Sequence, residues 1–313
     1  MKLNSETFVL LLVIAVLALV PLADISLRAI LLLAISLAFP ALGLGLLLRS
    51  GQVSFGHALY YAVGAYTVAV AQKLHVTDVF LTLALALAAS MVLGLILGAI
   101  LSRYRGIFYG MLNLAFSMVG FTLLLKLYDI TGGSDGMGIL RPTFLGHKFS
   151  NPQTAWAIYY LAVAVLVAGI LFLEQYMRSA PGSALGAIRT NETRLEYLGR
   201  SARQVFLAGH VISAGFAGVG GMIIAYSTSH VTPELAYWTL SAEFLIVAIF
   251  GGAGSFTAIT IGALAFVLLR NLISSYVVDA WQLILGIILL GIIMYMPDGL
   301  WTLFRKKPDA KAP

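Results

Sequence analysis

The side chains best suited to bind a metal are five histidines, and their spacing argues against a metal site. His57, His75, His147, His210 and His230 lie far apart in the sequence, and none belongs to a His-Glu-x-x-His pair. The sequence also lacks cysteine, which excludes thiolate metal sites, thiol nucleophiles and disulfides. We therefore expect neither a metal nor a cofactor.

Motifs for catalysis and for nucleotide binding are absent as well. The sequence has no Gly-x-Ser-x-Gly nucleophile elbow, no pair of carboxylates within one apolar segment and no Gly-x-x-x-x-Gly-Lys-Ser/Thr phosphate loop. The net charge is +6, but basic residues do not alternate with aromatic ones as on a nucleic-acid surface. We expect a protein that is not an enzyme, binds no nucleic acid and leaves any ATP hydrolysis to a separate chain.

Three polar side chains lie within apolar segments. Glu243 falls in the run 239–250, where an ionised carboxylate is costly unless it is paired or hydrated. We expect it to serve function or to stabilise a gate, although the neighbouring Thr239 and Ser241 are equally compatible with a site near the interface. Asn113 and His210 are expected to be buried groups whose hydrogen bonds neighbouring helices satisfy.

The pattern Gly-x-x-Ser-Phe occurs twice, in Gly51–Phe55 and in Gly252–Phe256. Irregular backbone inside a membrane is tolerated where protein or a water-lined cavity satisfies it, and helix ends there can bind a solute. Close packing of helices through small residues is the alternative. The candidates for a translocation pathway are Gln52, Ser54, His57, Asn113, Glu243 and Ser255.

The elements that position these residues are apolar runs of about 20 residues, the length of helix that crosses a bilayer. The 313 residues are 60% hydrophobic and 10% charged, against roughly 25% charged in soluble domains. We predict an all-α, polytopic helical membrane protein that forms one domain over 1–313. Full spans are expected at 8–23, 25–48, 55–73, 79–101, 106–127, 155–176, 204–227 and 281–297.

Two segments do not fit a simple span. Gly251–Ser255 interrupts the region 239–272, and neither half is expected to cross comfortably alone, so we predict a broken helical hairpin, either re-entrant or two short crossings. With about eight full spans, this gives 8–10 transmembrane helices. The run 8–23 lacks a small-x-small cleavage site, which favours a helix, tilted or interfacial, over a signal peptide.

Charge asymmetry predicts the orientation, because Lys and Arg concentrate in cytoplasmic loops. With both termini in the cytoplasm, 13 of the 19 basic residues lie inside. These are Lys2, Arg49, Arg103, Arg105, Arg178, Arg189, Arg194, Arg200, Arg203, Arg305, Lys306, Lys307 and Lys311.

The basic segment 177–203 is predicted to form two short helices under the membrane. Pro181 suits a first helical turn, Leu185 and Ile188 share a face, and Gly199 ends the second helix. Thr190–Asn191 separates the two helices, and Thr193–Glu196 fits a capping box. A solvated cytoplasmic loop is the plain interpretation. The more specific interpretation is a coupling element whose small apolar face contacts another protein.

Eight motifs together resemble one family, the permease subunits of branched-chain amino-acid ABC importers, specifically the LivM type. Gly186 departs from the family, which often has arginine there, and no Glu-Ala-Ala box is legible. The motifs are Gly51–Ala58, Gly64–Tyr66, Arg105–Tyr109, Leu114–Phe116, Thr131–Gly136, Ala187–Glu192, Gly251–Ser255 and Pro297–Leu300.

The resemblance implies a bacterial inner-membrane permease that passes branched-chain amino acids or similar small solutes. It implies three kinds of partner: a second permease subunit of the LivH type, two ABC ATPase subunits and an extracytoplasmic solute-binding protein. The outer connection 129–154, by default a flexible loop, would offer Thr131–Arg141 to the binding protein, together with Ser229–Glu234. The residues implied for ATPase coupling are Pro181, Gly182, Leu185, Ile188, Arg189, Asn191, Glu192, Arg194 and Gly199.

Two other functions fit the composition. An ion-coupled secondary transporter would carry related repeats of opposite topology, and no such repeat is visible. A membrane scaffold subunit that transports nothing is the second alternative. ATPase subunits should co-purify with an importer and with neither alternative.

Overall fold

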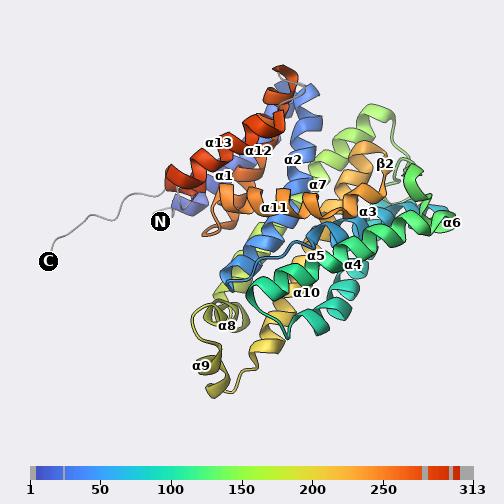
Figure 1. The fold of residues 1–313 in the computed structure, drawn as a ribbon. Coiled ribbons are helices and arrows are strands. Elements are labelled where there is room, and N and C mark those ends of the chain that lie inside the picture. Colours follow the sequence, from blue (N-terminus) through green and yellow to red (C-terminus); the bar gives the residue numbers. More distant parts are fainter. Residues whose placement is uncertain (1–4, 24, 277–280, 296–298, 304–313) are drawn as a thin grey trace.

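The computed structural model describes residues 5–23, 25–276, 281–295 and 299–303, which are mostly helical (Figure 1). The α-helices are α1 (Ser5–Ala23), α2 (Ile25–Arg49), α3 (His57–Lys73), α4 (Val79–Leu101), α5 (Gly106–Lys126), α6 (Tyr128–Thr131), α7 (Asn151–Arg178), α8 (Ala180–Ile188), α9 (Glu192–Tyr197), α10 (Ala202–Thr228), α11 (Trp238–Gly251), α12 (Phe256–Tyr276) and α13 (Trp281–Tyr295). Short 3-10 helices are η1 (Gly133–Asp135), η2 (Pro233–Ala236) and η3 (Gly299–Leu303), and two strands, β1 (Met137–Gly138) and β2 (His230–Val231), complete the fold.

The prediction of an all-α polytopic protein is confirmed. Six of the described helices, α2, α4, α5, α7, α10 and α12, are long and apolar enough to cross a membrane. The spans predicted at 55–73 and 281–297 form shorter helices of 17 and 15 described residues, α3 and α13.

Helix α10 lies at the centre of the bundle, where it packs against α2, α3 and α4. Glycines bring α3 and α10 into backbone contact: a Cβ atom on Gly64 would overlap the Gly218 carbonyl, and one on Gly221 would overlap the Tyr61 carbonyl. Small residues that let two backbones approach this closely are the usual interface of membrane helices. Helices α3 and α10 therefore pack through glycines that lie outside the two Gly-x-x-Ser-Phe patterns.

The region 239–272 is a broken pair of helices, as predicted, but the two halves are unequal. Helix α11 has 14 residues and ends at Gly252, whose φ of 108° a side chain would disfavour. Helix α12 has 21 residues and qualifies as a span, so the expectation that neither half crosses alone is wrong for α12. The helix continues past residue 272 to Tyr276, and Arg270 inside it pairs with Glu243 of α11.

The link between α10 and α11 enters the bundle. Its helix η2 packs against α3 and α5, and the Ser117 hydroxyl of α5 donates to the Ala236 carbonyl at 2.8 Å. At the start of α11, the Ser241 hydroxyl accepts the backbone N–H of Ala58, the second residue of α3, at 2.8 Å. Helix α11 thus begins beside the first turn of α3.

The connection from α5 to α7 is more ordered than the flexible loop expected for 129–154. Strand β1 pairs antiparallel with β2, with Met137 opposite Val231. The Gln72 side chain of α3 donates to the Leu140 carbonyl at 2.8 Å and accepts the Leu140 N–H at 2.7 Å. The connection also ends earlier, because α7 begins at Asn151.

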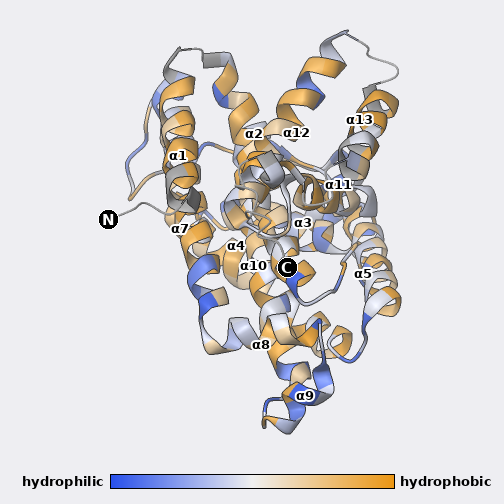
Figure 2. Cartoon of the chain, turned by 90° about the vertical axis from the view of Figure 1, so that its left-hand side faces the viewer, coloured by the Kyte–Doolittle hydropathy of each residue, from blue (hydrophilic) through white to orange (hydrophobic). Residues whose placement is uncertain are grey.

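The basic segment 177–203 forms α8 and α9, which project from one end of the bundle (Figure 2). The outer connection and the paired strands lie toward the opposite end (Figure 1). The residues that carry the prediction for the two chain termini, Lys2 and Arg305–Lys307 among them, lie outside the described residues.

Candidate functional site

The basic segment folds as its sequence predicts, with one difference in how α9 is capped. Pro181 lies in the first turn of α8, and Gly199, with a φ of 77°, follows the end of α9. The cap of α9 is Asn191, whose side chain accepts the Arg194 N–H at 2.9 Å. The predicted Thr193 capping box is therefore wrong, because the helix starts two residues earlier than that box requires.

The apolar face of α8 is covered by its own chain. Leu185 is fully buried and Ile188 is 5% exposed. Leu185 packs against Gly209 of α10, where an added Cβ would come within 3.0 Å of its side chain. The expectation that this face meets another protein is wrong, because α10 already covers it. Gly182 is also buried.

Helix α9 ends in the exposed apolar side chains of this segment. Tyr197 is 86% exposed and Leu198 75% exposed, and the exposed arginines Arg194 and Arg200 flank them. Sequence reasoning missed both apolar residues. The sequence signal that could have identified them is a Tyr-Leu pair directly before the glycine that ends the helix, in a stretch that is otherwise polar.

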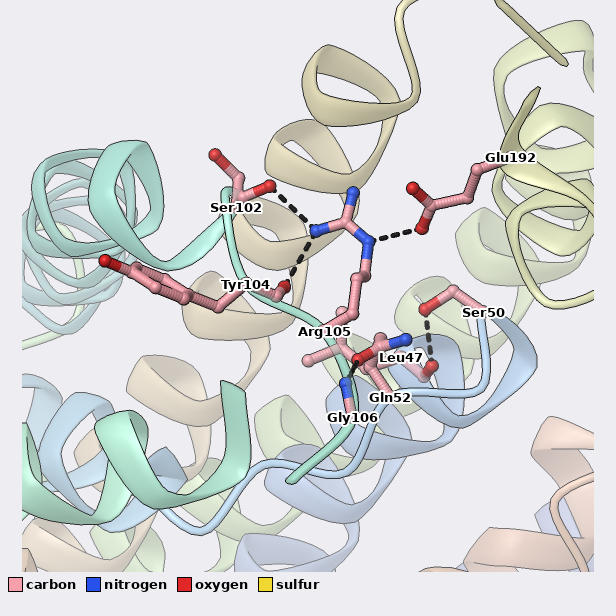
Figure 3. Close-up of polar contacts among 8 residues, drawn as sticks. All are labelled: Leu47, Ser50, Gln52, Ser102, Tyr104, Arg105, Gly106 and Glu192. Carbon is pink, nitrogen blue, oxygen red and sulfur yellow. Dashed lines mark hydrogen bonds and ion pairs between the residues drawn. The ribbon is translucent and has the colours of Figure 1, made fainter. Parts of the chain in front are cut away.

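Arg105 joins α9 to the turn between α4 and α5 (Figure 3). Its guanidinium forms an ion pair with Glu192, the first residue of α9, and donates to the carbonyls of Ser102 at 2.7 Å and Tyr104 at 2.8 Å. The same guanidinium lies over the ring of Phe206 in α10, 4.6 Å from its centre. One side chain therefore contacts three elements that are far apart in the sequence.

The contacts of Arg105 with Glu192, the α4–α5 turn and Phe206 are called the Arg105 junction below. The link between α2 and α3 joins this junction through Gln52. Its side-chain carbonyl accepts the N–H of Gly106, the residue after Arg105, at 2.6 Å (Figure 3). Gly51 has a φ of 76°, and a side chain there would lie 3.2 Å from Arg189, which follows α8. The α2–α3 link, the α4–α5 turn, the residue after α8 and the start of α9 thus meet at one place.

The predicted pathway residues Ser54 and His57 are fully buried. His57 Nδ1 is 2.9 Å from the Ser54 hydroxyl, and His57 Nε2 is 2.6 Å from the hydroxyl of Ser213 in α10. Both nitrogens therefore have partners from α10 and from the α2–α3 link. This geometry supports a role in joining α3 to α10, and the pathway role of these two residues stays a prediction.

A second buried histidine connects α3, α5 and α10. His210 Nε2 is 2.9 Å from the Tyr60 hydroxyl, and its Nδ1 is 2.8 Å from the Tyr109 hydroxyl. The prediction that neighbouring helices satisfy His210 is confirmed. Asn113 is satisfied only in part, since its amide nitrogen donates to the Tyr109 carbonyl while its buried Oδ1 has no hydrogen-bond partner among the described residues.

The remaining two predicted pathway residues lie on α11 and α12. Glu243 Oε1 is 2.6 Å from Arg270 Nη1, and both side chains keep part of their surface exposed. Ser255 is buried at the start of α12 and lines a cavity of about 130 Å³ with Arg49 and Glu174. The described residues therefore do not gather the six predicted pathway side chains around one cavity.

Each Gly-x-x-Ser-Phe pattern lies at a break between helices. The first separates α2 from α3, and the second separates α11 from α12. Arg49 at the end of α2 donates to the Gly254 carbonyl at 2.9 Å, which brings the second break to the end of α2. No group of three metal-ligating side chains occurs in the parts of the chain that the structure describes.

The fold and this junction define a multi-pass helical membrane protein with a polar segment anchored at one end. Residues 26–293 match the family described as "Branched-chain amino acid transport system / permease component". The chain belongs to this family, and it is therefore a permease component of a branched-chain amino acid ABC transport system, not an enzyme. Such a component works with partner subunits, and ATP is hydrolysed on separate chains. Family membership excludes the secondary-transporter and scaffold alternatives.

Two curated relatives carry the same name, "High-affinity branched-chain amino acid transport system permease protein LivM". The protein from Escherichia coli K12 is 28% identical over 294 residues, which cover 86% of this chain and 69% of the relative. The protein from Salmonella typhimurium LT2 is 28% identical over 295 residues, which cover 87% and 69%. The predicted resemblance is confirmed. No solved structure matches the chain.

Proposed function

We propose that the chain forms half of a membrane pathway for branched-chain amino acids or similar small solutes in a bacterial inner membrane. Its partners are a LivH-type permease subunit, two ABC ATPase subunits and an extracytoplasmic solute-binding protein. The names of the two curated relatives support this solute class. The basic segment at one end of the bundle supports a cytoplasmic location for α8 and α9. The distribution of basic residues along the sequence supports the same location for both termini.

In this proposal, α9 carries the contact to the ATPase. Tyr197 and Leu198 are large apolar side chains that water surrounds in the isolated chain, and aromatic and apolar anchors dominate protein interfaces. The predicted coupling residues that are exposed form the polar surroundings of these anchors. They are Pro181, Arg189, Asn191, Arg194 and Gly199.

The observation that carries the proposal is the Arg105 junction. A displacement of α9 pulls on Arg105 through Glu192, and Arg105 is bonded to the α4–α5 turn and stacked on α10. The Gly106–Gln52 hydrogen bond passes the displacement to the α2–α3 link, and the Leu185–Gly209 contact passes it directly to α10. Coupling is then mechanical, through packed elements with two arrangements.

The pathway is proposed on the side of the bundle where the Glu243–Arg270 pair keeps exposed surface. An ion pair within apolar helices needs protein or water around that surface, and a second permease subunit would supply it. Gln52, Ser54, His57 and Ser255 belong to this proposal through the helix breaks beside which they lie, and Asn113 through its buried Oδ1, which has no hydrogen-bond partner among the described residues.

At the opposite end, the proposed docking surface for the solute-binding protein comprises Thr131–Arg141 and Ser229–Glu234. Strands β1 and β2, one from each segment, are paired. Two segments about 90 residues apart thus form one ordered surface, which supports a shared contact.

The experiment compares two leucines of the basic segment. Leu198→Asp places a charge at the exposed end of α9, and we expect the ATPase subunits to co-purify at least about tenfold less, as for loss of an interface anchor, with the thermal midpoint of the permease unchanged. Leu185→Asp is the matched variant at a buried site, and it should lower the thermal midpoint. Retention of the ATPases by a folded Leu198→Asp variant would move the contact away from α9.

Solute transport is tested separately by ATP-dependent uptake of labelled leucine into proteoliposomes that hold the complete complex. Uptake lost on omission of this chain supports the proposed solute. A complex that hydrolyses ATP in response to its binding protein but takes up no leucine would keep the architecture and discard the solute.

A further inference from the structure

Three cavities follow one another along α7, starting at the end of the bundle opposite α8 and α9. The first, of about 210 Å³, lies between the starts of α2 and α7, the end of α10 and residues 139–142. It shares Ile158 and Tyr226 with a second cavity of only about 10 Å³, which in turn shares Val165 and Val219 with a third of about 390 Å³. We call these three adjacent cavities the α7 groove; it is narrowest at the second cavity, where a bound chain would have to displace side chains.

The first cavity of the α7 groove is polar and cationic. Arg28 and Arg141 both line it, and no carboxylate occurs among the described residues of its lining. Neither arginine belongs to an ion pair among the described residues, and Arg28 instead lies over the ring of Trp156, 4.9 Å from its centre. Two guanidinium groups at one cavity repel each other, and a bound phosphate group would remove that repulsion while accepting hydrogen bonds from both.

Hydroxyl groups complete this polar end. Tyr226, Ser227 and Ser229 come from the end of α10, and Thr154 comes from the first turns of α7. The amide donors of that turn are largely occupied, because Ser150 and Gln153 form a capping box and residue 152 is proline. The two arginines, rather than the helix end, therefore make this cavity suited to an anion.

The rest of the α7 groove is apolar. Its second and third cavities are lined by side chains such as Leu83 and Met91 of α4, Val165 and Phe172 of α7, and Phe216 of α10. From Thr154 to Phe172, α7 rises about 27 Å, which exceeds the roughly 15 Å of hydrocarbon in one leaflet. A groove with an anion site at one end and this apolar length matches an amphiphile.

Aromatic residues place the cationic end at the level of lipid headgroups. Trp156 stacks on Tyr160 with ring centres 5.7 Å apart, and Tyr159 lies beside both. Tryptophan and tyrosine concentrate where the hydrocarbon core meets the headgroups. The phosphate of a phospholipid in this leaflet therefore lies at the height of Arg28.

We propose that the α7 groove binds one anionic phospholipid, with its headgroup phosphate between Arg28 and Arg141 and one acyl chain against α4, α7 and α10. A free phosphate ion would use the arginines and leave the apolar length empty. The lipid would fill the space between α7 and α10 and so stiffen the bundle beside α10, the helix at its centre.

The test measures lipid binding to the purified complex by native mass spectrometry, with phosphatidylglycerol and phosphatidylcholine of equal chain length. Both lipids carry a phosphate, but the quaternary ammonium of phosphatidylcholine would lie beside two guanidinium groups, so we expect phosphatidylglycerol to bind at least about tenfold more tightly. Arg28→Gln with Arg141→Gln should reduce this preference to about twofold. Lys148→Gln, at the same end but outside the cavity, should leave it unchanged.

Two further measurements separate a lipid from an ion. Ala168→Trp fills the exposed apolar part of the groove and should weaken long-chain phosphatidylglycerol more than a short-chain analogue. Inorganic phosphate should compete poorly with the long-chain lipid. Equal binding of the two lipids by the unchanged protein would overturn the proposal, and so would full competition by inorganic phosphate with no effect of Ala168→Trp.

Discussion

Two arginine–glutamate pairs use the same chemistry in different surroundings. Arg105–Glu192 joins a turn and a short helix 87 residues apart at the polar end of the bundle, whereas Arg270–Glu243 joins two consecutive helices inside it. Arg105 has further acceptors in two carbonyls and lies over an aromatic ring. The comparison teaches that two ion pairs of similar exposure differ in what they hold: Arg105–Glu192 links segments far apart in the sequence, and Arg270–Glu243 links two consecutive helices.

The largest effect is expected from breaking the inner pair. Arg270→Met leaves the carboxylate of Glu243, whose side chain is 23% exposed, without its positive partner on an apolar helix, a loss that approaches about 3–5 kcal/mol only where the remaining charge is fully buried. The thermal midpoint of the purified complex should fall sharply. The double variant Arg270→Met with Glu243→Gln removes both charges and should recover most of the loss. A single variant as stable as the unchanged protein would show that water already solvates Glu243.

A moderate effect on function, with little effect on stability, is expected from the outer pair. Glu192→Gln should lower the free energy of unfolding by less than about 1 kcal/mol, as the loss of a partly exposed ion pair does. ATP-dependent uptake should fall about three- to tenfold, because a displacement of α9 is no longer transmitted to Arg105. Glu196→Gln, an exposed change on the same helix, is the control. Equal uptake by both variants would remove Arg105–Glu192 from the coupling route.

The smallest effect is expected from Arg105→Lys. Lysine keeps the charge opposite Glu192 but loses the planar group that also reaches the Ser102 and Tyr104 carbonyls. Uptake should fall by about twofold, less than in Glu192→Gln, consistent with the loss of neutral hydrogen bonds. A larger fall than in Glu192→Gln would show that holding the α4–α5 turn is the main task of Arg105.

Much of the local structure could be predicted from the sequence. Pro181, Asn191 and Gly199 act on the backbone within a few residues, so they set the bounds of α8 and α9 wherever the segment lies. The apolar spacing of Leu185 and Ile188 likewise showed that α8 has a buried face. It carried no information on whether another protein or the same chain covers that face.

Contacts between distant segments could not be predicted. The sequence does not show that Arg270 pairs with Glu243, because the two residues are 27 positions apart on different helices and no local pattern fixes how α11 and α12 align. Gln72 and Leu140 are 68 residues apart, and their two hydrogen bonds order a connection whose glycines alone indicate flexibility. Both contacts depend on packing that forms only in the complete bundle.

The backbone contact between α3 and α10 has a mechanical consequence. Where Gly64 and Gly221 leave no side chain between two helices, neither helix can slide or roll without its backbone striking the other. We therefore expect the two helices to move as one rigid unit. The irregular backbone nearest to the start of α3 is the α2–α3 link, where Gly51 has a φ of 76°, so a change of shape is expected there rather than along the two helices.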